Sequence, residues 1–488
     1  MNYKPFLFFG LLVLYFVHGV KSQTAAVSFP DNSNGAIARE WVELINNGDD
    51  AALKSFITNR FSESALKQQK LEDLFVLFRN LQKQSGGIEV RSVRPNTGQL
   101  PLAFEIKSKT GDHYGLVRMG MNGEKLAGIG IDKIENPLMP GWKEGKLSES
   151  EMIAEIRKQV KIRAENGDFS GVVLIARNDR ILLNEPLGYA DRESKIPNTT
   201  ETRFHLASVG KMFTVAAVAT LVKSGKISFT DTVEKLLPDF PHREVFSKIT
   251  VHQLLSHSAG LGTFFESPGF DPQKRYRNSM EEIAVYQDEP LFFAPGTKWR
   301  YSNAGYSLLG AIIEKVSGQT YRGYIRENVF QPLQMKDTDP GSFDISTRNA
   351  AVLYQQTEVD PFGLEPYLVN RELASSPATA FGGGFTTTLD LYRFARAYQT
   401  GSLLGKDLTD TIVTPKIEVG QNQFWGYGIT QTTVNGEIVR GHSGGSRADL
   451  AILWNSGYIV VVLGNVTPPS VAALSSRIVD YISKQRNS

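Results

Sequence analysis

Apolar residues follow a helical period in the first part of the chain and a strand period after it. Three segments carry apolar stripes at helical spacing, at residues 37–45, 51–57 and 66–81. Four strand-like segments follow, at residues 88–93, 102–107, 114–119 and 124–131. Turn sequences such as Asn122-Gly123 separate these segments. The pattern predicts a small α+β domain over residues 36–136, with three helices followed by an antiparallel meander.

A second and larger unit is predicted over residues 147–488. It opens with a helix and two strands, at residues 149–166, 170–177 and 180–187. It closes with four strands and a helix, at residues 425–433, 436–441, 449–454, 458–464 and 470–482. Strands at both ends with helices between them predict one antiparallel sheet that is assembled from both ends of the unit. The Pro/Gly-rich stretch 137–146 is predicted to be the linker between the two units.

The first 22 residues have the features of a secretory signal peptide. Residues 5–17 form a short apolar stretch after Lys4, and small residues precede a cut after Ser22. An uncleaved membrane anchor is the alternative, but this stretch is short for a bilayer span. We therefore expect residues 1–22 to be removed and residues 23–35 to form a leader. The protein is then exported without a stable membrane anchor.

Composition restricts the chemistry and the partners. The chain has no cysteine, which excludes disulfides, thiol catalysis, thiolate zinc sites and the lipidated cysteine of a bacterial lipoprotein. An exported protein without disulfides suits a bacterial periplasm or medium. Removal of Lys4 and Lys21 with the signal peptide would leave 51 of the 53 basic residues, against 51 acidic residues. This balance gives no electrostatic case for nucleic-acid binding.

Ser208 and Lys211 stand three residues apart, at the start of an apolar segment, 212–222, that is predicted to be a buried helix. Residues at this spacing share a helix face and nearly touch. Burial lowers the pKa of a lysine, and a lysine that is partly neutral can take the proton of a serine hydroxyl. The pair therefore predicts an activated serine nucleophile.

Two further segments offer polar groups suited to the same chemistry. Tyr301 and Asn303 lie in one loop after a Pro-Gly turn, and the residues after them are predicted to be helical. A nearby lysine would lower the pKa of the Tyr301 phenol and make it a general base. His442 lies in a Gly-rich segment that follows a predicted strand. Glycines there would let a substrate backbone approach closely.

Together these segments form an ordered set of three motifs. The motifs are Ser208-x-x-Lys211, Tyr301-x-Asn303 and His442-Ser443-Gly444. They resemble the three motifs of the serine β-lactamase and penicillin-binding protein superfamily. Their order and spacing are most similar to the branch of class C β-lactamases, D-aminopeptidases and family VIII esterases, and segments 254–261 and 382–385 are also similar to segments of that branch.

The resemblance covers roughly residues 147–486 and implies a fold and a mechanism. The implied fold is α+β, a β-lactamase-like transpeptidase fold with an antiparallel sheet flanked by helices and a helical subdomain. The small domain before it has the element order of cystatin-like cone domains. The resemblance assigns the following roles: Ser208 as acylated nucleophile, Lys211 and Tyr301 in proton transfer, Asn303 in holding the substrate amide or ordering Lys211, and the N–H groups of Ser208 and Gly445 in the oxyanion hole.

One position departs from the family pattern. His442 takes the place that a lysine usually holds, and a neutral histidine does not attract a substrate carboxylate as a lysine does. This departure disfavours a β-lactamase or a DD-peptidase proper and favours an esterase or an amidase. Arg447 would compensate only if its side chain pointed into the site. The expected substrate is a small ester, amide or peptide, and the expected mechanism needs no cofactor and no metal.

Three other interpretations make different predictions. Gly441-x-Ser443-x-Gly445 matches the nucleophile elbow of α/β-hydrolases, but a strand and not a helix is predicted after it. His252 and His257 stand five residues apart, not the four of a zinc-peptidase helix, and are predicted to be structural. A non-catalytic sensor or binding protein on the same fold is the alternative from another class.

Overall fold

The computed structural model describes residues 28–487 with gaps. The gaps are 95–101, 135–140, 240–243, 339–348, 356–367, 370–377 and 468–470, and the single residues 112, 264, 266, 272, 273, 275, 277 and 421. The predicted signal peptide lies outside the described residues, and so do residues 23–27 of the predicted leader and 137–140 of the predicted linker. None of the helices within these limits is long and apolar enough to cross a membrane.

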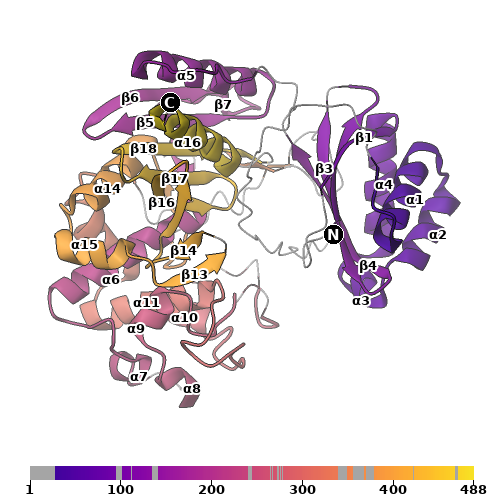
Figure 1. Ribbon diagram of the computed structural model, residues 1–488. Coiled ribbons are helices and arrows are strands. Elements are labelled where there is room, and N and C mark those ends of the chain that lie inside the picture. The colour runs from indigo at the N-terminus through magenta and orange to yellow at the C-terminus, as the bar shows by residue number, and fades with distance from the viewer. Residues whose placement is uncertain are drawn as a thin grey trace.

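Helices α1–α4 pack on one face of a four-stranded antiparallel sheet in the N-terminal unit (Figure 1). The strand order β1-β2-β3-β4 confirms the predicted meander. Trp41 is fully buried between the layers and makes edge contacts with Phe78 and Phe104, at 5.8 and 5.9 Å between ring centroids. The elements are α1 (Ser33–Asn47), α2 (Asp50–Arg60), α3 (Glu63–Gln68), α4 (Leu71–Ser85), β1 (Ile88–Arg94), β2 (Leu102–Ser108), β3 (Tyr114–Asn122) and β4 (Lys125–Ile134).

Two features of this unit differ from the prediction. The single helix predicted over 66–81 is two helices, because extended backbone at Gln69 and Lys70 separates α3 from α4. Helix α1 begins at Ser33, inside the predicted leader, because the Asn32 side chain caps its first turn and accepts from the Gly35 N–H at 3.0 Å.

An eight-stranded antiparallel sheet organises the C-terminal unit. Its strand order is β13-β14-β15-β16-β17-β18-β5-β6, so β18 near the end of the chain pairs with β5 from its beginning. This confirms a sheet assembled from both ends of the unit. The predicted strand over 425–433 is two strands, because the chain reverses between Gly426 and Ile429, with Gly428 in the left-handed region at φ +60°.

The strands of this sheet have three to eight residues, and the other strands of the unit have two or three. The sheet holds β5 (Gly171–Arg177), β6 (Arg180–Leu187), β13 (Ile417–Gly420), β14 (Gln423–Trp425), β15 (Thr430–Val434), β16 (Glu437–Gly444), β17 (Ala448–Leu453) and β18 (Tyr458–Gly464). The short strands are β7 (Tyr189–Asp191), β8 (Ile196–Pro197), β9 (Phe204–His205), β10 (Tyr354–Gln355), β11 (Leu368–Val369), β12 (Phe385–Thr386) and β19 (Val466–Thr467).

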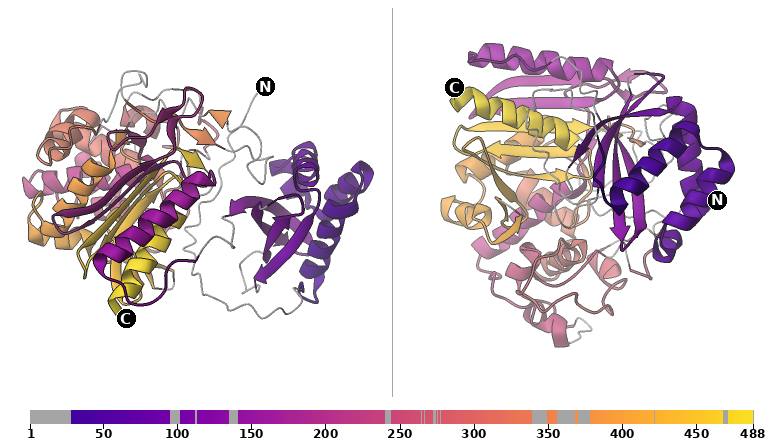
Figure 2. Two further views of the ribbon diagram at one scale, coloured as in Figure 1. Left: turned by 90° about the horizontal axis from the view of Figure 1, so that it is seen from above. Right: turned by 45° about the vertical axis from the view of Figure 1, so that its right-hand side comes forward.

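Helices cover both faces of this sheet. Helices α5 and α16 lie on one face and bury one apolar core against it (Figure 2). Helices α6, α11 and α14 belong to the larger core on the other face. The helices of the unit are α5 (Glu149–Glu165), α6 (Lys211–Lys223), α7 (Val233–Leu236), α8 (Glu244–Ser247), α9 (Val251–Leu255), α10 (Ser279–Ile283), α11 (Asn303–Ser317), α12 (Tyr321–Ile325), α14 (Thr388–Thr400), α15 (Lys406–Val413) and α16 (Val471–Asn487), with single turns η1 (Ala207–Gly210) and η3 (Arg326–Phe330).

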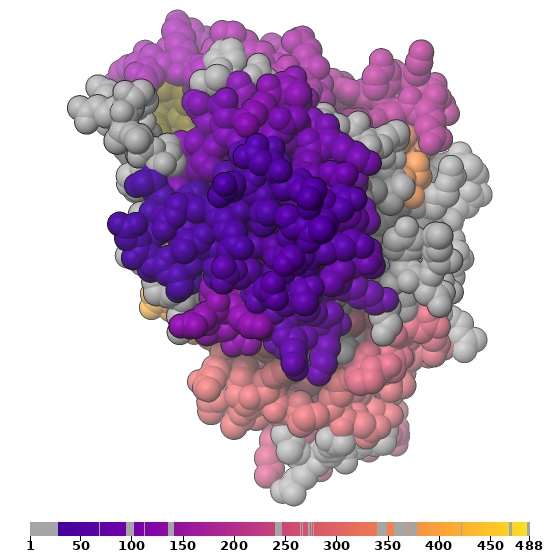
Figure 3. Space-filling view, turned by 90° about the vertical axis from the view of Figure 1, so that its right-hand side faces the viewer, coloured from indigo at the N-terminus to yellow at the C-terminus, as the bar shows by residue number. Residues whose placement is uncertain are grey.

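An ion pair joins the two units. Lys133 on β4 lies 3.0 Å from Asp168, which follows α5, and both side chains are largely buried. Figure 3 views the molecule from the side on which the N-terminal unit lies. The pair ties the end of the small sheet to the start of the larger unit, on the side of α5 and not at the Ser208 turn.

Candidate active site

Ser208 lies in the tight turn η1, directly before helix α6. Ala207 adopts a left-handed conformation at φ +45°, which is strained for a residue with a side chain and is typical of functional sites. The Gly382–Gly384 backbone packs against this turn: the Gly383 N–H donates to the Ala207 carbonyl at 3.0 Å. A Cβ at Gly382 would lie 2.5 Å from the same oxygen, so only glycine fits there. These glycines therefore let their backbone pack directly against the turn that carries Ser208.

Lys211 is fully buried at the start of α6. Its Nζ lies 3.3 Å from Ser208 Oγ and 2.7 Å from Asn303 Oδ1, and it also bonds the Phe381 carbonyl oxygen. Burial without a neighbouring carboxylate lowers the pKa of Lys211 well below 10.5. A neutral amine has two N–H donors and one lone pair. The amide and carbonyl oxygens take the two donors, which leaves the lone pair for the Ser208 hydroxyl.

Tyr301 lies on the other side of this amine. Lys211 Nζ is 4.8 Å from the centroid of the Tyr301 ring, and the Tyr301 hydroxyl bonds Ser208. Burial raises the pKa of Tyr301, although the bond to Ser208 opposes the rise. The expectation that a nearby cation lowers this pKa is therefore wrong, because burial of the phenol outweighs any such effect. Tyr301 is a protonated phenol that can pass a proton, and Lys211 is the better base.

Asn303 orders the lysine. It is the first residue of α11, whose N-cap Ser302 accepts from the Gly305 N–H at 2.8 Å. Its Oδ1 faces Lys211, and its Nδ2 donates to Thr263 Oγ1 at 3.2 Å. Both ends of the amide are thus held by the protein, and the arrangement matches the second of the two roles that the resemblance implied.

His442 and Ser443 point to opposite faces of strand β16, as successive strand residues do. The His442 ring meets Tyr301 and Trp425 edge-on, at 6.4 and 5.4 Å between centroids. Burial, with Lys211 as a second cause, lowers the pKa of His442 to about 3, so the ring is neutral at physiological pH. Ser443 instead donates to the buried carboxyl of Asp449 on β17. The structure brings His442 to the site and places Ser443 away from it.

Gly444 and Gly445 bring the end of β16 against the nucleophile. A Cβ at Gly444 would lie 3.2 Å from the Ser208 backbone nitrogen, so the two chain segments are in direct contact. Gly445 and Ser446 both have positive φ, at +48° and +64°, and the Arg447 N–H donates to the Gly444 carbonyl at 2.9 Å. This is a type I′ turn. A Cβ at Gly445 would lie 3.1 Å from the Ala207 Cβ, so this turn packs against η1, where the resemblance implies an oxyanion hole.

Arg447 folds back on its own turn. Its Nη1 donates to the Gly445 carbonyl at 3.1 Å, and the side chain is largely buried. Burial lowers the pKa of Arg447 to about 10, so the guanidinium keeps its charge at neutral pH. It is held by the turn that carries Gly445 and makes no hydrogen bond to His442.

His257 has the structural role that was predicted for it. Its Nδ1 accepts from the Ser302 N–H at 3.0 Å, and its ring lies 4.5 Å from that of Tyr301. The backbone of His257 is left-handed, at φ +58°. His257 therefore positions the loop that carries Tyr301, a contact that its position in the family-like segment 254–261 did not reveal.

The other interpretations find little support in the geometry. Strand β17, not a helix, follows Ser443, so the elbow geometry is absent at that serine. His252 Nδ1 bonds the Tyr427 hydroxyl at 2.7 Å and His257 bonds Ser302, so the two histidines do not converge. Within the described residues no three metal-ligating side chains gather.

The family model named Beta-lactamase matches residues 154–481, and the chain belongs to this family of serine hydrolases. Penicillin-binding protein 4* of Bacillus subtilis (strain 168) is 31% identical over 297 residues, which are 58% of this chain and 64% of that protein. The chain thus spans less than two-thirds of the length of this curated relative.

Solved structures show the same fold. A penicillin-binding protein from Bacillus halodurans superposes with a TM-score of 0.58 at 28% identity, over 65% of this chain and 98% of that one. A D-amino acid amidase from Ochrobactrum anthropi SV3 superposes with a TM-score of 0.59 at 21% identity, over 68% of this chain and 99% of that one. The expected β-lactamase-like fold is confirmed for the C-terminal unit.

Proposed function

We propose that this protein is a serine hydrolase that forms an acyl-enzyme on Ser208 with ester or amide substrates. The observation that carries the proposal is the environment of Lys211. Its amine is fully buried, has no acidic partner, spends its donors on Asn303 and Phe381, and faces Ser208 Oγ at 3.3 Å. A neutral amine at hydrogen-bond distance is what a serine needs to become a nucleophile at neutral pH.

The proposed reaction runs in two halves. Lys211 takes the proton from Ser208 as Oγ attacks the carbonyl carbon, and the N–H groups of Ser208 and Gly445 hold the resulting oxyanion. Tyr301 passes a proton to the leaving alcohol or amine as its bond to carbon breaks, and it regains one from Lys211. Water then attacks the ester on Ser208, the same two residues return the proton to Oγ, and the free acid leaves.

The proposed acyl donors are neutral esters or amides, with D-amino-acid peptides and β-lactams as weaker candidates. A neutral His442 stands where a cation would attract a substrate carboxylate. Penicillins and peptidoglycan stems both carry a carboxylate, so a β-lactamase or DD-peptidase proper is the less favoured alternative. Export is proposed from the apolar segment 5–17 alone.

The test compares turnover of p-nitrophenyl butyrate by the wild-type protein and by Ser208→Ala. The proposal predicts loss of turnover in the variant. Equal rates in both would favour a non-catalytic binding protein with adventitious hydrolysis. A covalent serine probe adds a second comparison, with Ser443→Ala as matched control. The probe should still label Ser208 in the Ser443→Ala variant. Loss of labelling in Ser443→Ala, with labelling retained in Ser208→Ala, would show that Ser443 and not Ser208 is the nucleophile.

A further inference from the structure

Arg447 is a buried side chain with no role in the proposed reaction. It closes the turn over residues 444–447 that ends β16, and it is 8% exposed. Its Nη1 donates to the Gly445 carbonyl at 3.1 Å, while its buried Nε has no hydrogen-bond partner among the described residues. Burial lowers the pKa of Arg447 only to about 10, so the guanidinium is charged at neutral pH. The turn beside the nucleophile therefore carries a full positive charge.

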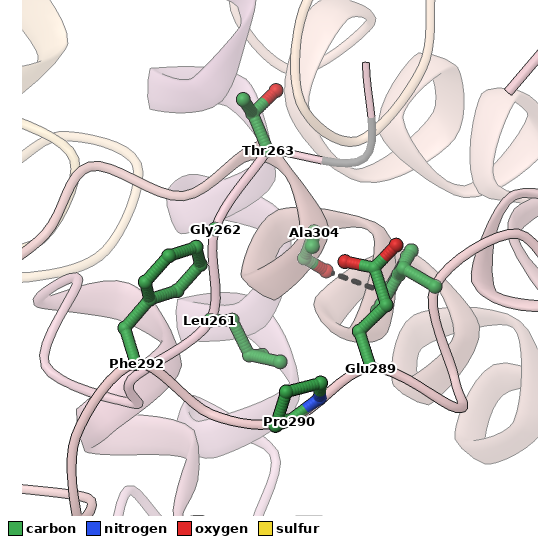
Figure 4. A pocket seen from close by; sticks show the side chains of 8 residues that line it. Leu261, Gly262, Thr263, Glu289, Pro290, Phe292 and Ala304 are labelled. Carbon is green, nitrogen blue, oxygen red and sulfur yellow. Dashed lines mark hydrogen bonds between the residues drawn. The ribbon is translucent and has the colours of Figure 1, made fainter. Parts of the chain in front are cut away.

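No acidic side chain in the part of the chain that the structure describes balances this charge. Burial is the cause that moves the pKa of Arg447, whereas a nearby carboxylate would raise it. The Asp449 carboxyl, two residues later, accepts from Ser443 instead. The Glu289 carboxylate faces a small pocket that Thr263 also lines (Figure 4). A buried charge without a partner is costly, and this cost falls when a negative charge forms near it.

The guanidinium lies against the residue whose N–H is proposed to hold the oxyanion. A Cβ at Gly445 would lie 3.4 Å from Arg447 Nη1 and 3.1 Å from the Ala207 Cβ. Ordinary bond lengths then place Nη1 within about 6 Å of the Gly445 nitrogen. An oxyanion bonded to that N–H lies about 3 Å from the nitrogen, and thus within about 9 Å of the charge. The guanidinium can act over this distance without entering the space of the substrate.

The other ionisable groups around the nucleophile turn are neutral before the reaction. His205 Nδ1 accepts from the Ala207 N–H at 3.2 Å, and burial, with Arg447 as a second cause, lowers the pKa of His205 to about 3. Burial alone lowers the pKa of Lys211, and His442 is neutral as well. The charge of Arg447 is therefore placed to act on an oxyanion and not on the lysine base.

We propose that Arg447 is a positioning residue of the oxyanion hole, whose charge stabilises the oxyanion without touching the substrate. The proposal rests on the proposed acylation of Ser208 and adds a residue outside the three motifs. The negative charge arises when Ser208 Oγ bonds to the carbonyl carbon and the π electron pair moves to the carbonyl oxygen. It disappears when that pair re-forms the carbonyl bond and the leaving group departs with its own bonding pair.

The size of the effect follows from this distance. A unit charge about 9 Å away, at an effective dielectric constant of about 20, changes a rate about twentyfold. The substrate carbonyl is neutral before attack, so the charge of Arg447 acts mainly in the transition state. Loss of this charge should therefore lower kcat and leave KM nearly unchanged.

The experiment uses two replacements of Arg447 that separate its charge from its hydrogen bond. Arg447→Lys keeps the charge, and Arg447→Gln keeps an N–H donor for the Gly445 carbonyl without the charge. Arg440→Gln is the matched control, because Arg440 lies earlier on the same strand and bonds Gln431 at 2.9 Å. The measurements are kcat and KM for p-nitrophenyl butyrate with the full chain. Thermal melting shows whether each variant is folded.

Arg447→Gln should lower kcat about twentyfold with KM within about twofold of the wild type. Arg447→Lys should retain most of the wild-type kcat, and so should Arg440→Gln. Equal falls in kcat for both Arg447 variants would assign the effect to packing of the side chain. An unchanged kcat in Arg447→Gln would show that the charge does not act on the reaction. Either result would overturn the proposal.

A boronic acid separates this proposal from the proposed function. n-Butylboronic acid forms an anionic tetrahedral adduct with a serine hydroxyl, so its binding requires no turnover. Its dissociation constant, followed by boron NMR, should rise about twentyfold in Arg447→Gln and change little in Arg447→Lys. If the wild type binds the boronic acid but does not hydrolyse the ester, the proposed function fails and these affinities decide the role of Arg447. Equal affinities in the wild type and Arg447→Gln, or no binding to the wild type, would overturn that role.

Discussion

Gly444→Ala is expected to destroy the oxyanion hole without unfolding the protein. Gly444 is the last residue of β16 and lies directly against the nucleophile turn. A methyl group there would lie 2.2 Å from the Leu206 carbonyl oxygen and 3.2 Å from the Ser208 nitrogen. The strand conformation itself accepts alanine, because Gly444 does not have a positive φ. The effect therefore comes from space and not from backbone strain.

The magnitude follows from the overlap. Real Cβ contacts essentially never fall below 3.0 Å, so a contact of 2.2 Å must open by nearly an ångström. The atoms that must move are the backbone of the turn that carries the Ser208 N–H. A displacement of about 1 Å in reacting groups costs about 10²-fold, and the loss of one oxyanion donor costs about 10²–10³-fold in kcat. We expect a fall in kcat of about 10²–10³, with a smaller change in KM.

The assay is steady-state hydrolysis of p-nitrophenyl butyrate, with thermal melting as the test of folding. Gly120→Ala is the matched control, because Gly120 is also a strand glycine and the nearest atom to a Cβ there is 3.8 Å away. It should keep wild-type kcat. A folded Gly444→Ala variant with kcat within threefold of the wild type would refute the oxyanion role of this contact.

Two other changes test the charges around the site. Burial raises the pKa of Asp449 from 3.8 to about 6, so the folded state keeps a proton that the unfolded chain releases. The free energy of unfolding should therefore fall by about 2 kcal/mol as the pH rises from about 4 to about 7. Asp449→Asn should lack this fall in urea unfolding at the two pH values, and an equal fall in both proteins would contradict the assignment. His442→Lys should raise kcat/KM for nitrocefin, which carries a carboxylate, about tenfold relative to p-nitrophenyl butyrate; an unchanged ratio would show that this position does not meet the carboxylate.

Local sequence patterns were enough to predict the meander, the larger sheet and the contact between Ser208 and Lys211. Ser208 and Lys211 are close in the chain, and the apolar segment after them predicts burial of the amine without knowledge of its partners. The spacing of apolar residues does not show where a helix ends if the apolar stripe continues into the next helix. This is the case at Gln69 and Lys70, between α3 and α4.

The parts that failed depend on contacts between distant segments. The pKa of Tyr301 is set by burial and by its hydrogen bond to Ser208, and neither can be read from neighbouring residues. Ser443 has the right motif position, but strand alternation turns it toward Asp449. The bond from Ser302 to His257 joins two loops that are far apart in the chain, so no local pattern reveals it.

The most direct test of Ser208 as the acylated residue is mass spectrometry of the protein quenched during turnover of p-nitrophenyl butyrate. Peptide mapping should find one butyryl group on the peptide that contains Ser208, and Ser208→Ala should carry none and release no p-nitrophenol above the background rate. A butyryl group on another residue during full turnover, or turnover by Ser208→Ala at the wild-type rate, would contradict acyl transfer through Ser208.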